Sequence, residues 1–224
     1  MESRLDSTYV PLGSRASWAK SLLLLAGAID CVALVTGFAL IRLVDELQQT
    51  GWVDIERFDT ADSRHALVGT LQIAVYVVAG IAFLRWFHRA YANLPAIGVD
   101  KTRHRPGWAI GAWFIPLASL VWPKRFADEI WRGSDPDGES AERKVPSLYG
   151  AWWRTFVISG IVVAIGSNVW TSAETESQLE LGAMVEFIGN LVGVASGVLA
   201  YLVVDRLSER QQARAVKLGA GPTS

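Results

Sequence analysis

The sequence predicts an all-α, polytopic membrane protein with four transmembrane helices. Of its 224 residues, 51% are hydrophobic and 19% are charged. The apolar residues stand in blocks almost free of charge, whereas a soluble domain would scatter them at the spacing of amphipathic helices. Four blocks have the length of about 17–25 residues that a helix needs to cross a bilayer. They form one membrane domain and comprise residues 21–41, 66–84, 153–173 and 183–204.

The first block is predicted to be retained as a helix after a cytoplasmic tail, residues 1–20. A cleaved signal sequence has an apolar region of roughly 7–15 residues, and residues 21–41 exceed that length. Asp30 precedes Cys31, at a place where lipoprotein processing needs a small residue. Because Cys31 is the one cysteine in the sequence, no intramolecular disulfide can form.

The third and fourth blocks indicate how their helices are anchored and packed. The third reaches full length only with Trp152 and Trp153 at the membrane interface, where Trp is enriched. The fourth carries a glycine at every fourth position: Gly189, Gly193 and Gly197. Glycines on one helix face let a second backbone approach closely, either inside the monomer or between the protomers of a homo-oligomer.

A fifth apolar block, residues 108–122, is too short to cross as a straight helix. Its 15 residues would cover about 22 Å of a hydrocarbon layer that is near 30 Å thick. Pro116 lacks an amide hydrogen and bends or breaks a helix at this point. The block is therefore predicted to be re-entrant or interfacial, with its broken backbone buried against protein. A full fifth crossing is the alternative, since proline occurs in membrane helices.

The re-entrant arrangement carries expectations for particular side chains. Trp113 and Phe114 should pack on the inner ends of the spans, and Gly107 and Gly111 should permit close approach. Two further residues, Trp108 and Trp122, should lie together at the interface, where an indole buries its ring and still donates its N–H.

The distribution of basic residues favours the re-entrant arrangement. If residues 108–122 return, 18 of the 21 Lys and Arg residues lie on one side, and the other side holds Arg42, Arg57 and Arg64. If they cross, the division becomes 8 against 13. The positive-inside rule selects the first division. It predicts a protein of the cytoplasmic membrane with both termini in the cytoplasm and a basic C-terminal tail, residues 205–224.

Two amphipathic helices are predicted on the cytoplasmic side of the chain. The first carries its apolar stripe on Trp86, Phe87, Ala90, Tyr91 and Leu94, and the second, after Pro123, on Phe126, Ala127, Ile130 and Trp131. The spacing is typical of helices that lie in the plane of the interface. They either dock anionic lipid or a partner protein, or serve as ordinary anchors.

An ordered series of motifs runs through this half of the sequence: Trp86, Arg89 and Asn93, then Gly107, Trp108, Trp113, Phe114 and Pro116, then Pro123, Glu129 and Trp131, and finally Trp152 and Trp153. The series resembles the bacterial membrane family catalogued as domain of unknown function 4328, over roughly residues 65–205. The resemblance implies a multi-pass bacterial membrane protein. It implies no reaction and supplies no catalytic residues.

The sequence contains no recognisable catalytic, cofactor-binding or metal-binding motif. Its histidines, His65, His88 and His104, have no partners at ligand spacing. The net charge of −1 provides no general basic field for nucleic acid, and no nucleic-acid module is evident. We therefore expect no cofactor, no metal and no nucleic-acid partner.

Asp30 is the one residue that points to chemistry inside the membrane. It stands ten residues into an apolar span, where a carboxylate costs a few kcal/mol and is by default a functional hypothesis. Gln72, Asn168 and Asn190 occupy the other three spans and are its expected neighbours. The cluster is either a proton or solute site, or a hydrogen-bonded clasp between helices.

Three functions remain open on these observations. The first is a non-enzymatic membrane protein that binds membrane lipid or a partner membrane protein through a Trp- and Arg-rich cytoplasmic layer. The expected layer comprises Trp86, Arg89, Asn93, Trp108, Trp113, Pro116, Pro123, Trp131, Trp152 and Trp153. The second is a small proton-linked transporter, dimeric or not, that uses Asp30. The third is a lipid-modifying enzyme at the cytoplasmic face, for which no nucleophile–base pair is evident.

Overall fold

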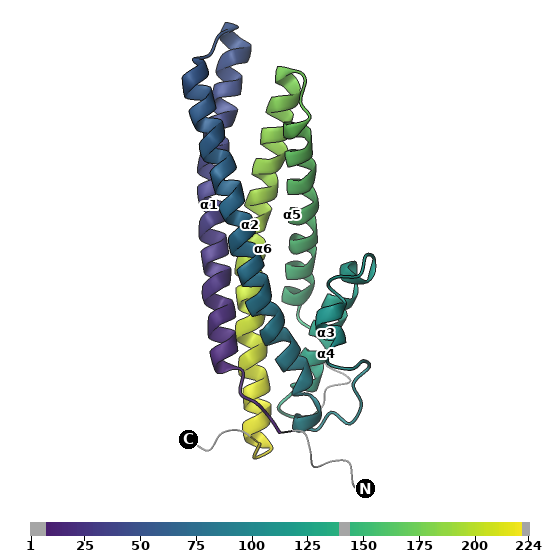
Figure 1. Ribbon diagram of the computed structural model, residues 1–224. Helices are drawn as coiled ribbons and strands as arrows, with labels where there is room; N and C mark the ends of the chain where they lie inside the picture. The colour runs from purple at the N-terminus through teal and green to yellow at the C-terminus, as the bar shows by residue number, and fades with distance from the viewer. Residues whose placement is uncertain (1–7, 139–143, 221–224) are drawn as a thin grey trace. The chain divides into compact units, whose positions relative to one another are not determined.

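The computed structural model describes residues 8–138 and 144–220, whose regular structure is entirely helical (Figure 1). The α-helices are α1 (Gly13–Thr50), α2 (Ile55–Ala92), α3 (Trp108–Gly111), α4 (Trp122–Gly133), α5 (Ser147–Thr171) and α6 (Glu176–Lys217). Two short 3₁₀ helices are η1 (Pro95–Ile97) and η2 (Ala118–Leu120). Helices α1, α2, α5 and α6 are long and apolar enough to cross a membrane. The prediction of an all-α protein with four such helices is confirmed.

The chain divides into two compact units. Unit 1 consists of Met1–Leu22, Ala79–Trp152 and Leu199–Ser224, and unit 2 consists of Leu23–Val78 and Trp153–Val198. Unit 2 contains the turns that join α1 to α2 and α5 to α6. Unit 1 contains both ends of the chain and the entire connection from α2 to α5.

The long helices extend well beyond the predicted spans. α1 has 38 residues and α6 has 42, so at 1.5 Å per residue each is roughly 60 Å long, about twice the hydrocarbon layer. In unit 1, α6 continues to Lys217 and buries Leu207, Gln211 and Ala215. Most of the predicted C-terminal tail is therefore packed helix. Part of the predicted N-terminal tail is helix as well, because α1 begins at Gly13.

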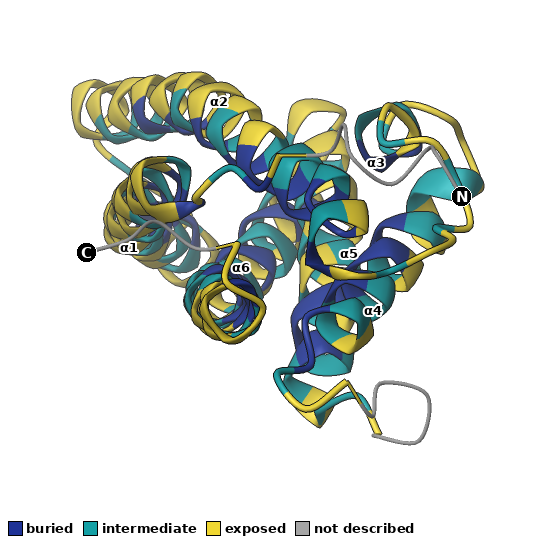
Figure 2. Ribbon diagram, turned by 90° about the horizontal axis from the view of Figure 1, so that it is seen from below, coloured by how far each residue is buried: buried dark blue, intermediate teal, exposed yellow. Residues whose placement is uncertain are grey.

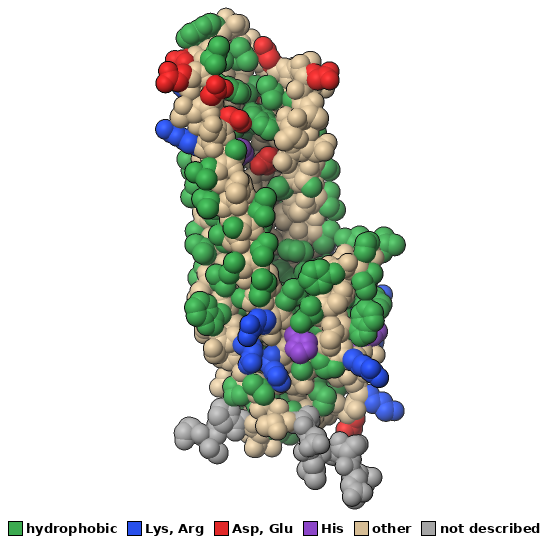
Figure 3. Space-filling view, viewed as in Figure 1, with side chains coloured by type: hydrophobic (Ala, Val, Ile, Leu, Met, Phe, Trp, Pro, Cys, Tyr) green, Lys and Arg blue, Asp and Glu red, His purple; other side chains and the backbone are tan. Residues whose placement is uncertain are grey.

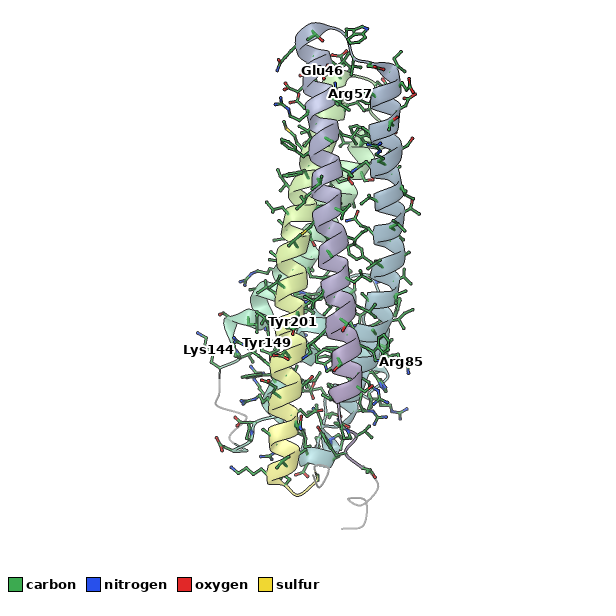
Figure 4. All side chains as sticks on the ribbon, turned by 90° about the vertical axis from the view of Figure 1, so that its left-hand side faces the viewer. Glu46, Arg57, Arg85, Lys144, Tyr149 and Tyr201 are labelled. Atoms are coloured by element: carbon green, nitrogen blue, oxygen red, sulfur yellow. The ribbon has the colours of Figure 1, made fainter. Side chains whose placement is uncertain are left out.

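Two tight turns close one end of unit 2. The α1–α2 turn is spanned by an ion pair in which Arg57 Nη1 lies 3.0 Å from Glu46 Oε2 (Figure 4). The Gln48 amide of α1 donates to Glu180 of α6 over 2.9 Å. Acidic side chains gather around these turns, at the top of Figure 3. The helix ends of unit 2 are therefore polar, whereas their middles are apolar.

Glycines bring α5 and α6 close together in unit 2. A Cβ atom on Gly189 would lie 2.8 Å from the backbone nitrogen of Val163, and one on Gly182 would lie 2.6 Å from that of Trp170. On α5, a Cβ atom on Gly166 would overlap the backbone of Glu186. The two helices approach at distances that only glycine allows, and Gly189 packs inside the monomer.

Unit 1 is built around an aromatic core. Trp86 and Phe87 of α2 are fully buried, and Trp152 of α5 is 2% exposed. The ring of Phe83 lies 5.3–5.8 Å, centroid to centroid, from all three of these rings. The Trp86 indole donates to Ser208 Oγ of α6 over 2.9 Å. The apolar stripe at the end of α2 therefore faces protein, and the expectation that it lies on lipid is corrected.

Helix α4 is the second amphipathic helix that the sequence predicts. Pro123 stands in its first turn, where its missing N–H costs no hydrogen bond. Phe126, Ala127 and Ile130 are buried along one side of the helix, while Arg125 is exposed (Figure 2). The buried stripe packs within unit 1, where the ring of Phe126 lies 4.9 Å, centroid to centroid, from that of Tyr91 of α2.

Candidate functional site

Asp30 lies at the centre of a polar group in unit 2, of which three side chains are buried and the fourth, Tyr76, is 45% exposed. The Asp30 side chain, on α1, is 3% exposed. The Gln72 amide of α2 donates to Asp30 Oδ1 over 2.9 Å, and the Tyr76 hydroxyl donates to the same oxygen. Gln72 also donates to Asn190 Oδ1 of α6 over 3.1 Å. We call Asp30, Gln72, Tyr76 and Asn190 the aspartate layer.

The aspartate layer differs from the expected cluster at one position. Asp30, Gln72 and Asn190 come together, but Asn168 is exposed on α5 and lies outside the group. Tyr76 takes the fourth place. The sequence signal for Tyr76 was weak because a tyrosine in an apolar span is ordinarily counted as an aromatic residue and its hydroxyl is overlooked.

Gly193 makes room for the Asp30 carboxylate. A Cβ atom on Gly193 would lie 3.4 Å from Asp30 Oδ2. Within the described part of the chain, Oδ2 takes part in no hydrogen bond, whereas Oδ1 accepts two. A Cβ atom on Gly197 would make only an ordinary contact, 3.9 Å from the carbonyl oxygen of Leu23. The three regularly spaced glycines therefore meet three different neighbours.

A second polar group lies on the same three helices. The Thr36 hydroxyl of α1 is 3.0 Å from His65 Nδ1 of α2. His65 Nε2 is 3.3 Å from Glu186 Oε1 of α6, and both of these side chains are 16% exposed. We call Thr36, His65 and Glu186 the histidine layer. No local sequence motif predicts this layer, because His65 lies 29 positions from Thr36 and 121 positions from Glu186.

The two layers are stacked along the helices of unit 2. Each takes one residue from α1, one from α2 and one from α6, and the aspartate layer adds Tyr76. On α6, Glu186 precedes Asn190 by four residues, a rise of about 6 Å. On α2, His65 precedes Gln72 by seven residues, a rise of about 10 Å. Two carboxylic acids and an imidazole thus lie within the span of a few helical turns.

Each layer contains an acidic side chain and neutral hydrogen-bonding groups. Such groups stabilise a charge or a proton inside a low-dielectric span. The described residues contain no cluster of three or more His, Cys, Asp or Glu side chains that could hold a metal ion.

The segment 108–122 turns back on itself in unit 1. Helix α3 makes a single turn, and the ring centroids of Trp108 and Trp122 lie 5.6 Å apart, as expected for a segment that returns. The Ala118 N–H donates to the Pro116 carbonyl over 2.8 Å, with Leu117 between them at φ 65° and ψ −45°. This is the rare γ-turn with positive φ, which is strained for any residue but glycine. We call residues 108–122 the apolar hairpin.

The tip of the apolar hairpin is exposed. Leu117 is 80% exposed and Phe114 is 73% exposed, so the expected packing of Phe114 is corrected. The expected burial of the broken backbone is also corrected, because local turn hydrogen bonds satisfy the amides of Trp113, Phe114 and residues 118–121. Trp113 does pack inward, with its ring 5.7 Å from that of Phe83.

Half of the ten members of the expected cytoplasmic layer are buried and leave little surface. Those at most 8% exposed are Trp86, Asn93, Trp152 and Trp153, and Pro123 is buried as well. Arg89 and Trp131 are half-buried, whereas Trp108 and Pro116 are exposed. No atom lies within 4 Å of the position of a Cβ atom on Gly107, so the close approach expected at this glycine does not occur. The accessible part of the layer is therefore the apolar hairpin.

A charged groove of about 610 Å³ also lies in unit 1. Its basic lining residues are Lys101, Arg103, Arg125, Arg132 and Arg214. Its acidic residues are engaged: Asp128 pairs with Lys124 at 2.5 Å, and Asp135 pairs with Arg210 at 3.0 Å. Glu129 accepts hydrogen bonds from the Arg103 amide and the Tyr91 hydroxyl.

Comparison with known protein families gives a match over most of the chain. A family model described as domain of unknown function (DUF4328) matches residues 49–209. No curated protein and no solved structure matches the chain.

Proposed function

The chain belongs to the family described as domain of unknown function 4328, and from that premise we propose that it is a non-enzymatic inner-membrane protein of bacteria that engages anionic lipid through unit 1. The four apolar helices anchor it. The apolar hairpin enters the cytoplasmic leaflet, and the charged groove meets the lipid headgroups.

Leu117 is the observation that carries the proposal. A positive φ costs a leucine roughly 1–2 kcal/mol, a cost that glycine avoids. A large apolar side chain nevertheless occupies this position and is 80% exposed. Strain at an exposed position is characteristic of a site where the side chain has a use outside the fold. Hydrocarbon is the environment that an exposed leucine side chain favours.

The surroundings of the hairpin fit a membrane interface. Trp108 and Trp122 stand together at its base, and tryptophan favours the headgroup level of a bilayer. Lys124 and Arg125 follow directly on α4, and Arg125 lines the charged groove. Basic side chains near the surface of an anionic leaflet contribute about 1 kcal/mol each.

The proposed orientation places both termini in the cytoplasm. Both ends of the chain belong to unit 1, which agrees with an even number of crossings. Reporter fusions after residues 55, 140 and 178 and at the C-terminus test it. We expect external signals at 55 and 178 only, and an external signal at 140 would overturn the orientation.

Depth-dependent quenching tests the hairpin directly. Leu117→Cys in a Cys31→Ser background would carry a fluorophore, and the protein would be reconstituted in vesicles with brominated acyl chains. We expect strong quenching at 117 and little at a matched label on Asp59→Cys, which is exposed near the start of α2. A label at 117 that responds only to a water-soluble quencher would overturn the proposal.

A second variant separates lipid contact from folding. Leu117→Gly removes the apolar side chain and relieves the positive φ, so the folded state should lose no stability. We expect it to retain its melting temperature in detergent while it binds fewer anionic phospholipids than wild type in native mass spectrometry. Equal retention of anionic lipid by Leu117→Gly and wild type would argue against a lipid role.

A further inference from the structure

We propose that the aspartate and histidine layers form a proton-binding site with two stations, one at Asp30 Oδ2 and one at His65 Nδ1. This goes beyond lipid engagement, because the layers lie in unit 2, whereas the hairpin and groove lie in unit 1. The ligand is a proton, and the site loads and unloads it without a metal or a cofactor.

The hydrogen bonds of Asp30 favour one oxygen for the proton. Oδ1 accepts from both Gln72 and Tyr76, so its lone pairs are engaged. Oδ2 faces the space beside Gly193, within 3.4 Å of the position of a Cβ atom there. A proton on Oδ2 leaves both existing hydrogen bonds intact. The two hydrogen bonds to Oδ1 are therefore kept in both the carboxylate and the carboxylic acid.

His65 is also held so that both protonation states are satisfied. In the neutral ring with its proton on Nε2, that N–H donates to Glu186, and the Thr36 hydroxyl donates to Nδ1. When Nδ1 gains a proton, it donates to the Thr36 oxygen instead. The Thr36 hydroxyl then turns to the carbonyl oxygen of Ala33, which is 3.2 Å away. Rotation of the Thr36 hydroxyl is therefore enough to satisfy the hydrogen bonds of His65 in both protonation states.

The charge inventory favours protons in this region. The groups that face Asp30 are Gln72, Tyr76 and Asn190, and those that face His65 are Thr36 and Glu186. No Lys or Arg belongs to either layer, and residues 155–171 of α5 contain no titratable side chain. Two ionised carboxylates with a neutral imidazole would leave two uncompensated negative charges in the span. That state is costly in low dielectric, so protonation of the layers relieves it.

The two stations are distinct and do not form a continuous proton wire. The amides of Gln72 and Asn190 lie in the aspartate layer and carry no titratable proton. The histidine layer stands nearer to the tight turns of unit 2, because His65 is ten residues from the first residue of α2 and Gln72 is seventeen.

Infrared spectroscopy of the full chain in lipid vesicles tests the aspartate station. The chain has 22 Asp and Glu residues, so the signal of Asp30 is the part of the protonated carboxyl absorption that wild type shows and Asp30→Asn lacks. We expect this difference to change with pH. Asn retains a carbonyl oxygen for both hydrogen bonds, so the variant should fold. Asp59→Asn, at an exposed position, is the matched control and should keep the absorption of Asp30. Identical carboxyl absorption of wild type and Asp30→Asn at every pH would overturn the aspartate station.

Nitrogen-15 NMR of the histidine rings tests the second station. The wild-type chain has three histidines, and comparison with His65→Gln identifies the signal of His65. We expect this ring to pass from the Nε2–H form to the doubly protonated form as the pH falls. A His65 ring that keeps one form at every pH at which the protein is folded would overturn the histidine station.

Discussion

Asn93 and Gln211, 118 positions apart in the sequence, share a buried hydrogen bond of 3.0 Å from Nδ2 to Oε1. Asn93 also pairs with both backbone groups of Val10, at 3.2 and 2.8 Å. The Gln211 amide donates to the Ala90 carbonyl and to Ser134 Oγ. Four segments of unit 1 therefore meet at two amide side chains that are fully buried.

Asn93→Ala and Gln211→Ala should both destabilise unit 1. Each leaves buried donors or acceptors without partners, at about 1–3 kcal/mol for each group. Gln212→Ala is the matched control, because Gln212 is the next residue on α6 and is exposed. Thermal unfolding in mild detergent should show a clearly lower melting temperature for the first two variants and almost no change for the third. Equal melting temperatures for all three would contradict this account of the core.

Gly189→Ala should destabilise the α5–α6 pair of unit 2. The added Cβ would lie 2.6 Å from Val163 Cγ2 and 2.8 Å from its backbone nitrogen, so the helices must move apart. Overpacking of this kind costs about 1–3 kcal/mol. Gly160→Ala meets nothing within 4 Å at an exposed position of α5, and should be neutral. The ratio of folded to aggregated protein after heating distinguishes the two variants.

Arg210→Lys should destabilise unit 1, and Arg210→Ala should do so more strongly. The guanidinium lies 4.0 Å from the ring centroid of Trp131, donates to that residue's carbonyl oxygen over 3.1 Å, and pairs with Asp135 at 3.0 Å. A lysine keeps the charge but cannot make all three contacts at once. We expect Arg210→Lys to lower the free energy of unfolding by about 1–2 kcal/mol. Arg206→Ala, exposed one turn earlier on α6, should change the melting temperature little.

The four spans could be predicted because a bilayer demands a length and an apolarity that few other segments share. The ends of the helices could not be predicted in the same way. Beyond residue 204, α6 is polar in composition, and the packing of Leu207, Gln211 and Ala215 in unit 1 stabilises it. The return of the apolar hairpin followed from Pro116 and charge bias. The exposure of its tip did not, because the sequence does not reveal that turns satisfy the backbone locally.

The candidate site was predictable in part for a related reason. A polar residue in a span turns toward other helices, and this rule alone pointed to Asp30, Gln72 and Asn190. It also pointed to Asn168, which is exposed on α5. The rotation of each helix about its axis decides which polar residues meet, and one sequence does not supply it. The same rotation brings His65, which directly precedes the apolar block 66–84, to Glu186, near the start of the block 183–204.

Asp30→Asn and Asp30→Ala together separate the structural role of this residue from its proton chemistry. Asn still accepts hydrogen bonds from Gln72 and Tyr76, so we expect a melting temperature in detergent close to that of wild type. Ala leaves two donors without an acceptor, which costs about 1–3 kcal/mol for each, and should lower the melting temperature by several degrees. If both variants are as stable as wild type, the aspartate layer does not hold the helices together. If Asn is as damaging as Ala, the charge of the carboxylate contributes to folding, and the hydrogen-bonded clasp alone does not account for Asp30.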